Sequence, residues 1–309
     1  MKHIISIAIL AFNFSLFGAE IDSFTPRYLK LQDATDLLNK ETKTLLQKAV
    51  EQANSKGNCS EARLSLEIWN IMWDHQGELR RFLSEEGPLD TFKNEIDESV
   101  YRQLNAQESI VLGGLSRFDN RLGTVIKIGE YLIGSDKFEH FFGFGYGYYM
   151  LHNYGKTSVP KLLTLNTASD RYIFGGTSTG VISFADKTAN FAGFRFYQNL
   201  TGKKADFIDG TFNSKPIIEC IEDNYVLHGD RFDWTKFIDA SWDESYNCSY
   251  FRRETMKKKI DREIELLEQN TGLHYQCPMD PKALDHAKLY WGKLSRDLIN
   301  DKGHQSIRN

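Results

Sequence analysis

The sequence lacks a strong charge excess, a long apolar run after its first residues, and the commonest metal-binding motifs. Its 309 residues carry 38 lysines and arginines against 42 acidic residues, so bulk charge implies neither nucleic acid nor an anionic membrane surface as a partner. No H-E-x-x-H motif occurs, and no two cysteines lie at the short C-x2-4-C spacing of zinc sites. The activity must therefore be sought in local polar sites.

The first 19 residues have the layout of a secretory signal peptide, with a basic start (Lys2, His3), an apolar run over 4–17, and then Gly18-Ala19. We expect cleavage near Gly18 or Ala19. An uncleaved anchor is the alternative, but the run is shorter than the roughly 20 residues that a spanning helix needs. The prediction is a periplasmic or secreted protein with no membrane-spanning segment after signal removal.

All four cysteines follow the predicted signal, and an even number in an exported chain predicts two disulfides with three possible pairings. Their wide spacing argues against a zinc site. We favour Cys248 with Cys277, which leaves Cys59 and Cys220 for the second bond.

The periodicity of apolar residues predicts a mainly α fold, in which 20–202 form a helical core domain and 203–309 form a cysteine-containing region packed on that core and stapled by disulfides. A β-rich run from Gly123 to Gly134 predicts a small hairpin. The predicted helices cover residues 28–53, 60–84, 89–104, 136–154, 183–200, 234–246, 250–269 and 281–299.

Two of these helices carry polar residues at helical spacing. Asp136 and His140 are one turn apart, and Gly143 and Gly147 continue their face without a side chain that would block a neighbour. We expect another helix or a ligand to approach there.

The second helix carries Ser183, Asp186, Asn190 and Gly193 along one stripe. If the two stripes face each other, their acids, His140 and Asn190 are buried together, because a buried charge needs such partners. The pair of helices is therefore the candidate site.

The series Asp-Lys-x-x-His-Phe, followed by Ser-x-x-Asp-x-x-x-Asn-x-x-Gly, resembles a pattern of uncharacterised bacterial envelope proteins, including periplasmic lipoprotein-like chains and, more distantly, the VanZ-like family. The resemblance covers about a fifth of the chain, from Gly134 to Gly193, and implies an envelope location but no mechanism. VanZ-like relatives are membrane proteins, whereas charged residues interrupt both helices here. It rests on Asp136, Lys137, His140, Phe141, Ser183, Asp186, Asn190 and Gly193.

Each residue of the site has a structural and a chemical interpretation. Asp136 with Glu139, and Ser183 with Asp186, have the spacing of helix caps. His140 is either a buried residue that fixes helix register or a general base oriented by Asp186 or Asp136. Glu139, among phenylalanines, is a surface glutamate or the acid of a glycan-cleaving pair.

The prediction for function is a non-catalytic exported envelope protein with a structural or ligand-binding helix pair, in which Ser183, Asn190 and Lys137 contact the ligand. The alternative is a periplasmic hydrolase of cell-wall or lipid-linked substrates, with His140, Asp186, Asp136 and Glu139 as candidate catalytic residues. We expect no cofactor. A metal with Asp136, His140 and Asp186 as ligands is the disfavoured alternative, since histidines are few and no H-E-x-x-H motif occurs, so we expect no metal. The expected partner is an envelope component or a cell-wall glycan, not nucleic acid.

Overall fold

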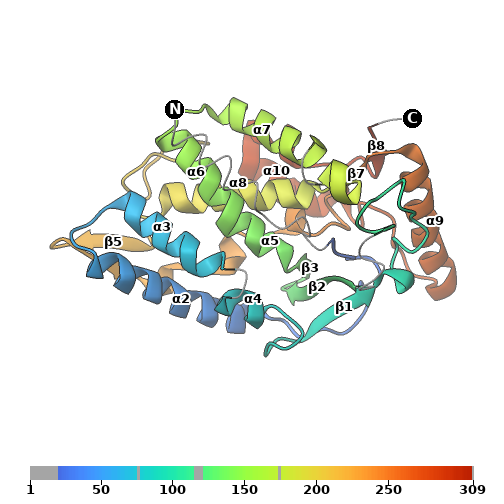
Figure 1. Cartoon of the computed structure of the whole chain (residues 1–309), viewed down its shortest axis with the longest axis horizontal. Helices are drawn as coiled ribbons and strands as arrows, with labels where there is room; N and C mark the ends of the chain where they lie inside the picture. Colours follow the sequence, from blue (N-terminus) through green and yellow to red (C-terminus); the bar gives the residue numbers. More distant parts are fainter. Residues whose placement is uncertain (1–19, 75–76, 115–120, 173–174, 308–309) are drawn as a thin grey trace.

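The computed structural model of the protein describes residues 20–74, 77–114, 121–172 and 175–307 (Figure 1). The predicted signal peptide, 1–19, lies outside the described residues.

Helices α6 (Gly145–Asn153) and α8 (Phe184–Asn199) cross closely in the middle of the molecule. A Cβ atom on Gly145 would lie 2.5 Å from the backbone of Gly193, and one on Gly193 would lie 1.8 Å from the carbonyl oxygen of Phe141. Glycine is therefore required at this crossing because backbone meets backbone.

Around this crossing lie helices from the N-terminal half. α2 (Thr35–Ser55) packs against α3 (Glu61–Met72), which is followed by the short α4 (Glu78–Phe82). α7 (Val159–Tyr172), which the sequence did not predict, joins the central pair. The apolar face of α2 is buried, and it includes Leu38, Leu45, Leu46, Ala49 and Ala53.

A three-stranded antiparallel sheet leads into the site. It is formed by β1 (Thr91–Glu95), β2 (Arg121–Ile128) and β3 (Tyr131–Gly134). The predicted hairpin is confirmed as β2 and β3, which turn at Gly129 with a positive φ of 59°. The helix predicted over 89–104 is wrong, because β1 pairs with β2 instead.

The C-terminal third contains more sheet than predicted. β5 (Ile218–Ile221) and β6 (Asn224–Leu227) form a second sheet, and β4 (Val181–Ile182), β7 (Tyr250–Phe251) and β8 (Gln305–Ser306) form a third. The helix expected over 234–246 is replaced by single turns at Trp234–Lys236 and Ala240–Trp242. The remaining helices are α9 (Glu254–Thr271), α10 (Leu284–Trp291) and α11 (Ser295–Leu298).

The predicted fold class is therefore wrong in two respects. The described residues contain three small sheets rather than one hairpin. Cys248 does pair with Cys277, but Cys59–Cys220 joins the start of α3 to β5, so the disulfides are not confined to a C-terminal region. The choice of Cys248–Cys277 leaves Cys59 and Cys220 as the second pair, but the sequence does not show that this pair ties α3 to β5, because their proximity depends on the tertiary fold.

Aromatic rings from distant parts of the chain pack beneath the first turns of the central helix. Phe141 contacts the rings of Trp234 and Trp242, and Phe138 contacts both as well. All four side chains are buried. This cluster fixes the backbone from which the candidate site projects.

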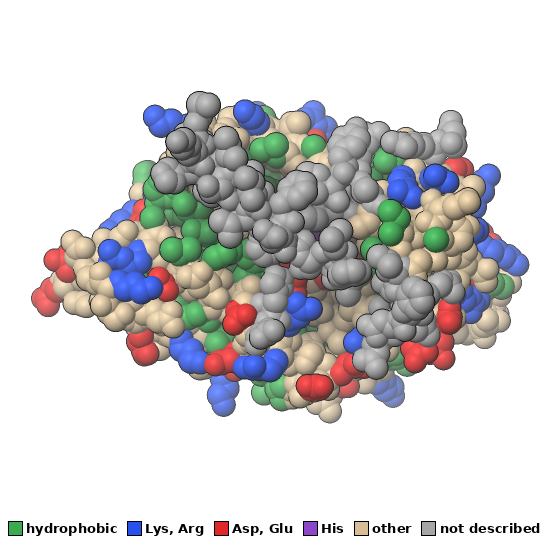
Figure 2. Space-filling model, in the orientation of Figure 1, with side chains coloured by type: hydrophobic (Ala, Val, Ile, Leu, Met, Phe, Trp, Pro, Cys, Tyr) green, Lys and Arg blue, Asp and Glu red, His purple; other side chains and the backbone are tan. Residues whose placement is uncertain are grey.

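No described helix is long and apolar enough to cross a membrane. The two disulfides are consistent with an extracytoplasmic location. On the face drawn in Figure 2, hydrophobic side chains gather over α3 and α6, and charged side chains lie mainly along the lower edge and the right side.

Candidate functional site

The first side of the site is an irregular helix. It begins as α5 (Asp136–Glu139), continues as a π-helical turn η3 (His140–Phe144), and only then becomes α6. A π turn adds one residue to the helix and rotates the next turns about the axis, which explains why Gly145, not Gly143 or Gly147, meets the second helix. Such turns occur frequently at functional sites, and this one begins at His140.

The second side is the first turns of α8. Ser183 is the N-cap, and its side-chain oxygen accepts a hydrogen bond from the Asp186 backbone N–H at 3.1 Å, so its predicted capping role is confirmed. The Ser183 hydroxyl also donates to Glu244 Oε1 at 2.8 Å. The Asp136 side chain, in contrast, caps no backbone group of α5, whose N-cap is Ser135.

Lys137 lies at the centre of the site, with a side chain that is 0% exposed. Its ammonium is 2.7 Å from Asp136 Oδ2, 2.6 Å from Asp186 Oδ1 and 2.7 Å from Glu244 Oε1. Burial by itself would lower the pKa of Lys137, but these three carboxylates raise it well above its ordinary value. The lysine is therefore a permanent internal cation.

The site holds more carboxyl groups than Lys137 can neutralise. Burial, the nearby Asp186 and the nearby Asp136 raise the pKa of Glu244 to about 7, although Lys137 acts in the opposite direction. Burial and the neighbouring acids, above all Glu244, raise the pKa of Glu20 well above its usual range. The cluster therefore favours an additional positive charge, either a proton or a cation.

Asp186 is the exception among these acids. Burial disfavours its charged form, but His140 and Lys137 outweigh that effect and lower its pKa. Asp136 has a raised pKa, because burial outweighs the attraction of Lys137. The two acids that flank the lysine therefore have opposite tendencies, and Asp186 is the more strongly ionised.

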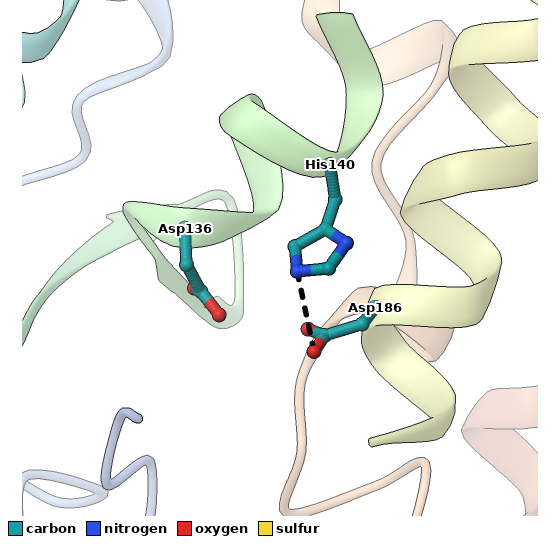
Figure 3. A group of neighbouring side chains, drawn as sticks. All are labelled: Asp136, His140 and Asp186. Atoms are coloured by element: carbon teal, nitrogen blue, oxygen red, sulfur yellow. Dashed lines mark ion pairs between the residues drawn. The ribbon is translucent and has the colours of Figure 1, made fainter. Parts of the chain in front are cut away.

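His140 is held at both ring nitrogens (Figure 3). Its Nδ1 donates to Asn190 Oδ1 at 2.9 Å, since an amide oxygen only accepts, and its Nε2 lies 3.3 Å from Asp186 Oδ2. The Asn190 amide in turn donates to Asn166 Oδ1 at 2.9 Å, which also accepts from the Tyr148 hydroxyl. Asn190 at Nδ1 and Asp186 at Nε2 therefore orient the imidazole together. Asp186 is one of the two acids expected in that role.

The polar groups are not sealed inside the protein. The side chains of Asp136 and His140 are each 17% exposed and that of Asp186 is 21% exposed. Asp136 Oδ1 is buried and has no hydrogen-bond partner among the described residues. Asp136 also borders a pocket of about 400 Å³ with Glu139 and Trp73 in its wall. A ligand can therefore reach the edge of the cluster.

The predicted residues divide into two groups. The structure brings Asp136, Lys137, His140, Ser183, Asp186 and Asn190 into one network. Glu139 is outside this network and lies 3.6 Å from Arg80 in the wall of the pocket that Asp136 borders. The sequence did not point to Glu20, Glu244 or Asn166, because nothing in their spacing relates them to either helix. Tyr148 lies on the first of the two helices, but its bond to Asn166 depends on α7, which was not predicted.

A second sequence signal is Gly176-Thr177-Ser178-Thr179-Gly180, which has the spacing of a hydrolase nucleophile elbow. An elbow needs a strand before the serine and a helix after it. Ser178 instead lies in the π-helical turn Gly175–Thr179, which follows α7 and precedes β4. The structural context therefore does not support this motif as an elbow.

Comparisons of the chain with protein-family models, with curated proteins and with solved structures find no match.

Proposed function

We propose that this protein is exported to the periplasm or beyond the cell, and that the cluster around His140 activates a water molecule for hydrolysis of an envelope component. The observation that carries the proposal is the convergence of His140 Nε2 and Asp186 Oδ2, 3.3 Å apart, at a site that is partly open to solvent. A histidine–aspartate pair with a purely structural role is expected to be closed to solvent, with every polar atom hydrogen-bonded.

The hydrogen bond from Nδ1 to Asn190 leaves Nε2 of the neutral ring with a lone pair. A water molecule beside it donates one hydrogen to Nε2 and the other to a carboxylate oxygen of Asp186 or Asp136. The lone pairs of the water oxygen then face the substrate, and His140 takes the proton as the bond from water oxygen to the substrate forms. The scissile bond breaks as the imidazolium returns this proton to the leaving oxygen or nitrogen, which restores neutral His140. Asp186 stabilises the resulting imidazolium.

The pocket beside Asp136 is lined by charged residues and by Trp73. A substrate with polar groups would therefore fit in it. Cell-wall fragments and lipid-linked precursors are the substrate classes that fit an exported protein. The test is product release from both classes, followed by mass spectrometry, for the wild type and for His140→Asn. His152→Asn is the control, since His152 bonds only locally, to the Thr157 carbonyl.

We expect the wild type and His152→Asn to release product. The rate of product release by His140→Asn should be at least about 100-fold lower, which is the lower end of the contribution of a general base. Equal product release by His140→Asn contradicts the proposal.

The second candidate is a non-catalytic helix pair, which the dense hydrogen bonding of Asn190 and Asn166 favours. It predicts no product from any variant, and a His140 imidazole that neither titrates nor exchanges with solvent in proton NMR.

A further inference from the structure

The atoms that face His140 Nε2 are the kind that bind a metal ion. One ligand atom each from Asp136, His140 and Asp186 lie within 4.8 Å of one another, and the three residues come from the first turns of two helices packed on each other (Figure 3). We infer that Asp136, His140 and Asp186 bind one divalent transition-metal cation, such as Zn²⁺ or Mn²⁺. This inference rests on the proposed function and changes the role of His140 in it. With an ion bound, the Nε2 lone pair is a ligand, so the ion would activate the water and an acid of the cluster would accept the proton in place of His140.

The distance between His140 and Asp186 fits two ligands of one ion. Metal–nitrogen and metal–oxygen bonds of about 2.0–2.2 Å at a tetrahedral angle separate two ligand atoms by roughly 3.3–3.5 Å. The observed separation of Nε2 and Oδ2 is 3.3 Å. A neutral imidazole lone pair facing a carboxylate is repulsive, so this arrangement is stabilised either by a proton on Nε2 or by a cation between the two atoms. The titration below distinguishes these two cases.

The surroundings supply the supporting contacts that metal sites use. A metal-bound histidine usually donates its other ring N–H to an oxygen, which fixes the tautomer. His140 does so to Asn190 Oδ1, outside the set of ligands. Lys137 holds Asp186 by Oδ1 and so leaves Oδ2 directed at His140. Oδ1 of Asp186 therefore pairs with Lys137, and Oδ2 is the oxygen that would bind the ion.

Charge also favours a cation. Glu20 and Glu244 add negative charge next to the two ligand acids, and within the described cluster Lys137 is the only permanent cation. Burial and mutual repulsion raise the pKa of Glu20 and Glu244, so these acids bind protons when no cation is present, and a divalent ion would supply that positive charge instead. One imidazole and two carboxylates select Zn²⁺ or Mn²⁺ over Ca²⁺, which prefers oxygen ligands alone.

The site is also open in the manner of a catalytic metal site. Three protein ligands leave coordination positions for water, whereas structural zinc sites are closed by four. The ligand side chains are partly exposed, and Asp136 borders the pocket.

The experiment is titration of chelator-treated full-length protein with Zn²⁺ and Mn²⁺ by calorimetry. We expect one ion per chain, affinity at least 100-fold weaker in His140→Asn and in Asp186→Asn, and a 10–100-fold loss in Asn190→Ala. His274→Asn is the matched control, because His274 forms a surface pair with Glu268 and should leave binding unchanged. A wild type that binds neither ion, or unchanged affinity in both ligand variants, overturns the inference.

A measurement on the wild type guards against variants that fail to fold. Nitrogen-15 NMR of the eight histidines should show one imidazole whose Nε2 signal shifts on addition of Zn²⁺ while its Nδ1 keeps its proton. No shifted Nε2 signal at one equivalent of Zn²⁺ overturns the inference. Zinc binding without product release contradicts only the proposed hydrolase, whereas product release by chelator-treated protein without zinc binding contradicts only the metal site.

Discussion

At the scale of single residues, Lys137 decides whether the acids of the site can be buried together. Removing one partner of a buried ion pair leaves uncompensated charge and costs about 3–5 kcal/mol. We expect Lys137→Met to lower the free energy of unfolding by that amount in urea denaturation. Lys48→Met, which removes an exposed ion pair with Glu78, should cost less than about 1 kcal/mol. Equal effects of the two substitutions would show that Lys137 is not a structural counter-charge.

Glu244 should make stability depend on pH. Burial and the neighbouring Asp186 and Asp136 raise its pKa from an unfolded value near 4.5 to about 7, despite Lys137. The folded state therefore binds this proton more tightly, so its contribution to stability is complete below about pH 4.5 and is lost as pH rises to about 7. The loss is on the order of 3 kcal/mol.

Glu244→Gln tests this assignment, because glutamine keeps the shape of the side chain and does not titrate. In chelator-treated protein, the free energy of unfolding of the wild type should fall more steeply between pH 4.5 and 7 than that of the variant. Glu20, Asp136, Asp186, Lys137 and His140 face the same cluster and remain in both proteins. Parallel pH curves would mean that Glu244 is ionised throughout this range.

At the scale of elements, the close crossing of α6 and α8 depends on glycine at one position and not at another. Gly193→Ala places a Cβ atom 1.8 Å from the Phe141 carbonyl oxygen, so the helices must separate. We expect a loss of about 3 kcal/mol or more in the free energy of unfolding. Gly147→Ala has nothing within 4 Å and should instead stabilise the protein by about 0.5–1 kcal/mol. Thermal unfolding of both variants checks the opposite signs.

The same elements show which features of the fold could be predicted from the sequence. Local signals predicted the β2–β3 hairpin, the Ser183 cap and the shared face of Asp136 and His140, because each depends on residues a few positions apart. The helix predicted over 89–104 failed because β1 gains a strand partner about 30 residues later. The π turn at His140 also has no periodic signal, so the predicted glycine seam was displaced to Gly145.

The candidate site, too, was predictable only where it depends on residues that are close in the sequence. Both helices and most of their polar residues could be identified from spacing, but the role of Lys137 could not, since its third carboxylate is Glu244, 107 residues away. The orientation of His140 depends likewise on Asn190, and through it on Asn166. Charge balance in a buried cluster is a property of the tertiary fold. The resemblance to envelope proteins stays a prediction.

At the scale of the whole molecule, the two disulfides differ in the length of chain that they close. Cys59–Cys220 spans 161 residues and ties α3 to β5, whereas Cys248–Cys277 spans 29 residues. Closing a longer loop removes more entropy from the unfolded chain, about 5 kcal/mol for the first bond and about 3.5 kcal/mol for the second. The long-range bond should therefore contribute more to stability.

Replacing each pair by serine separately, with urea unfolding as the measurement, tests this ranking. We expect the Cys59→Ser/Cys220→Ser protein to be the less stable of the two by about 1.5 kcal/mol. Addition of a thiol reductant to the wild type should destabilise it more than either double variant is destabilised, because it removes both bonds. The opposite ranking would mean that packing around Cys248, which is fully buried, contributes more than the difference in loop entropy. The Cys248–Cys277 disulfide would then be the principal covalent constraint on the fold.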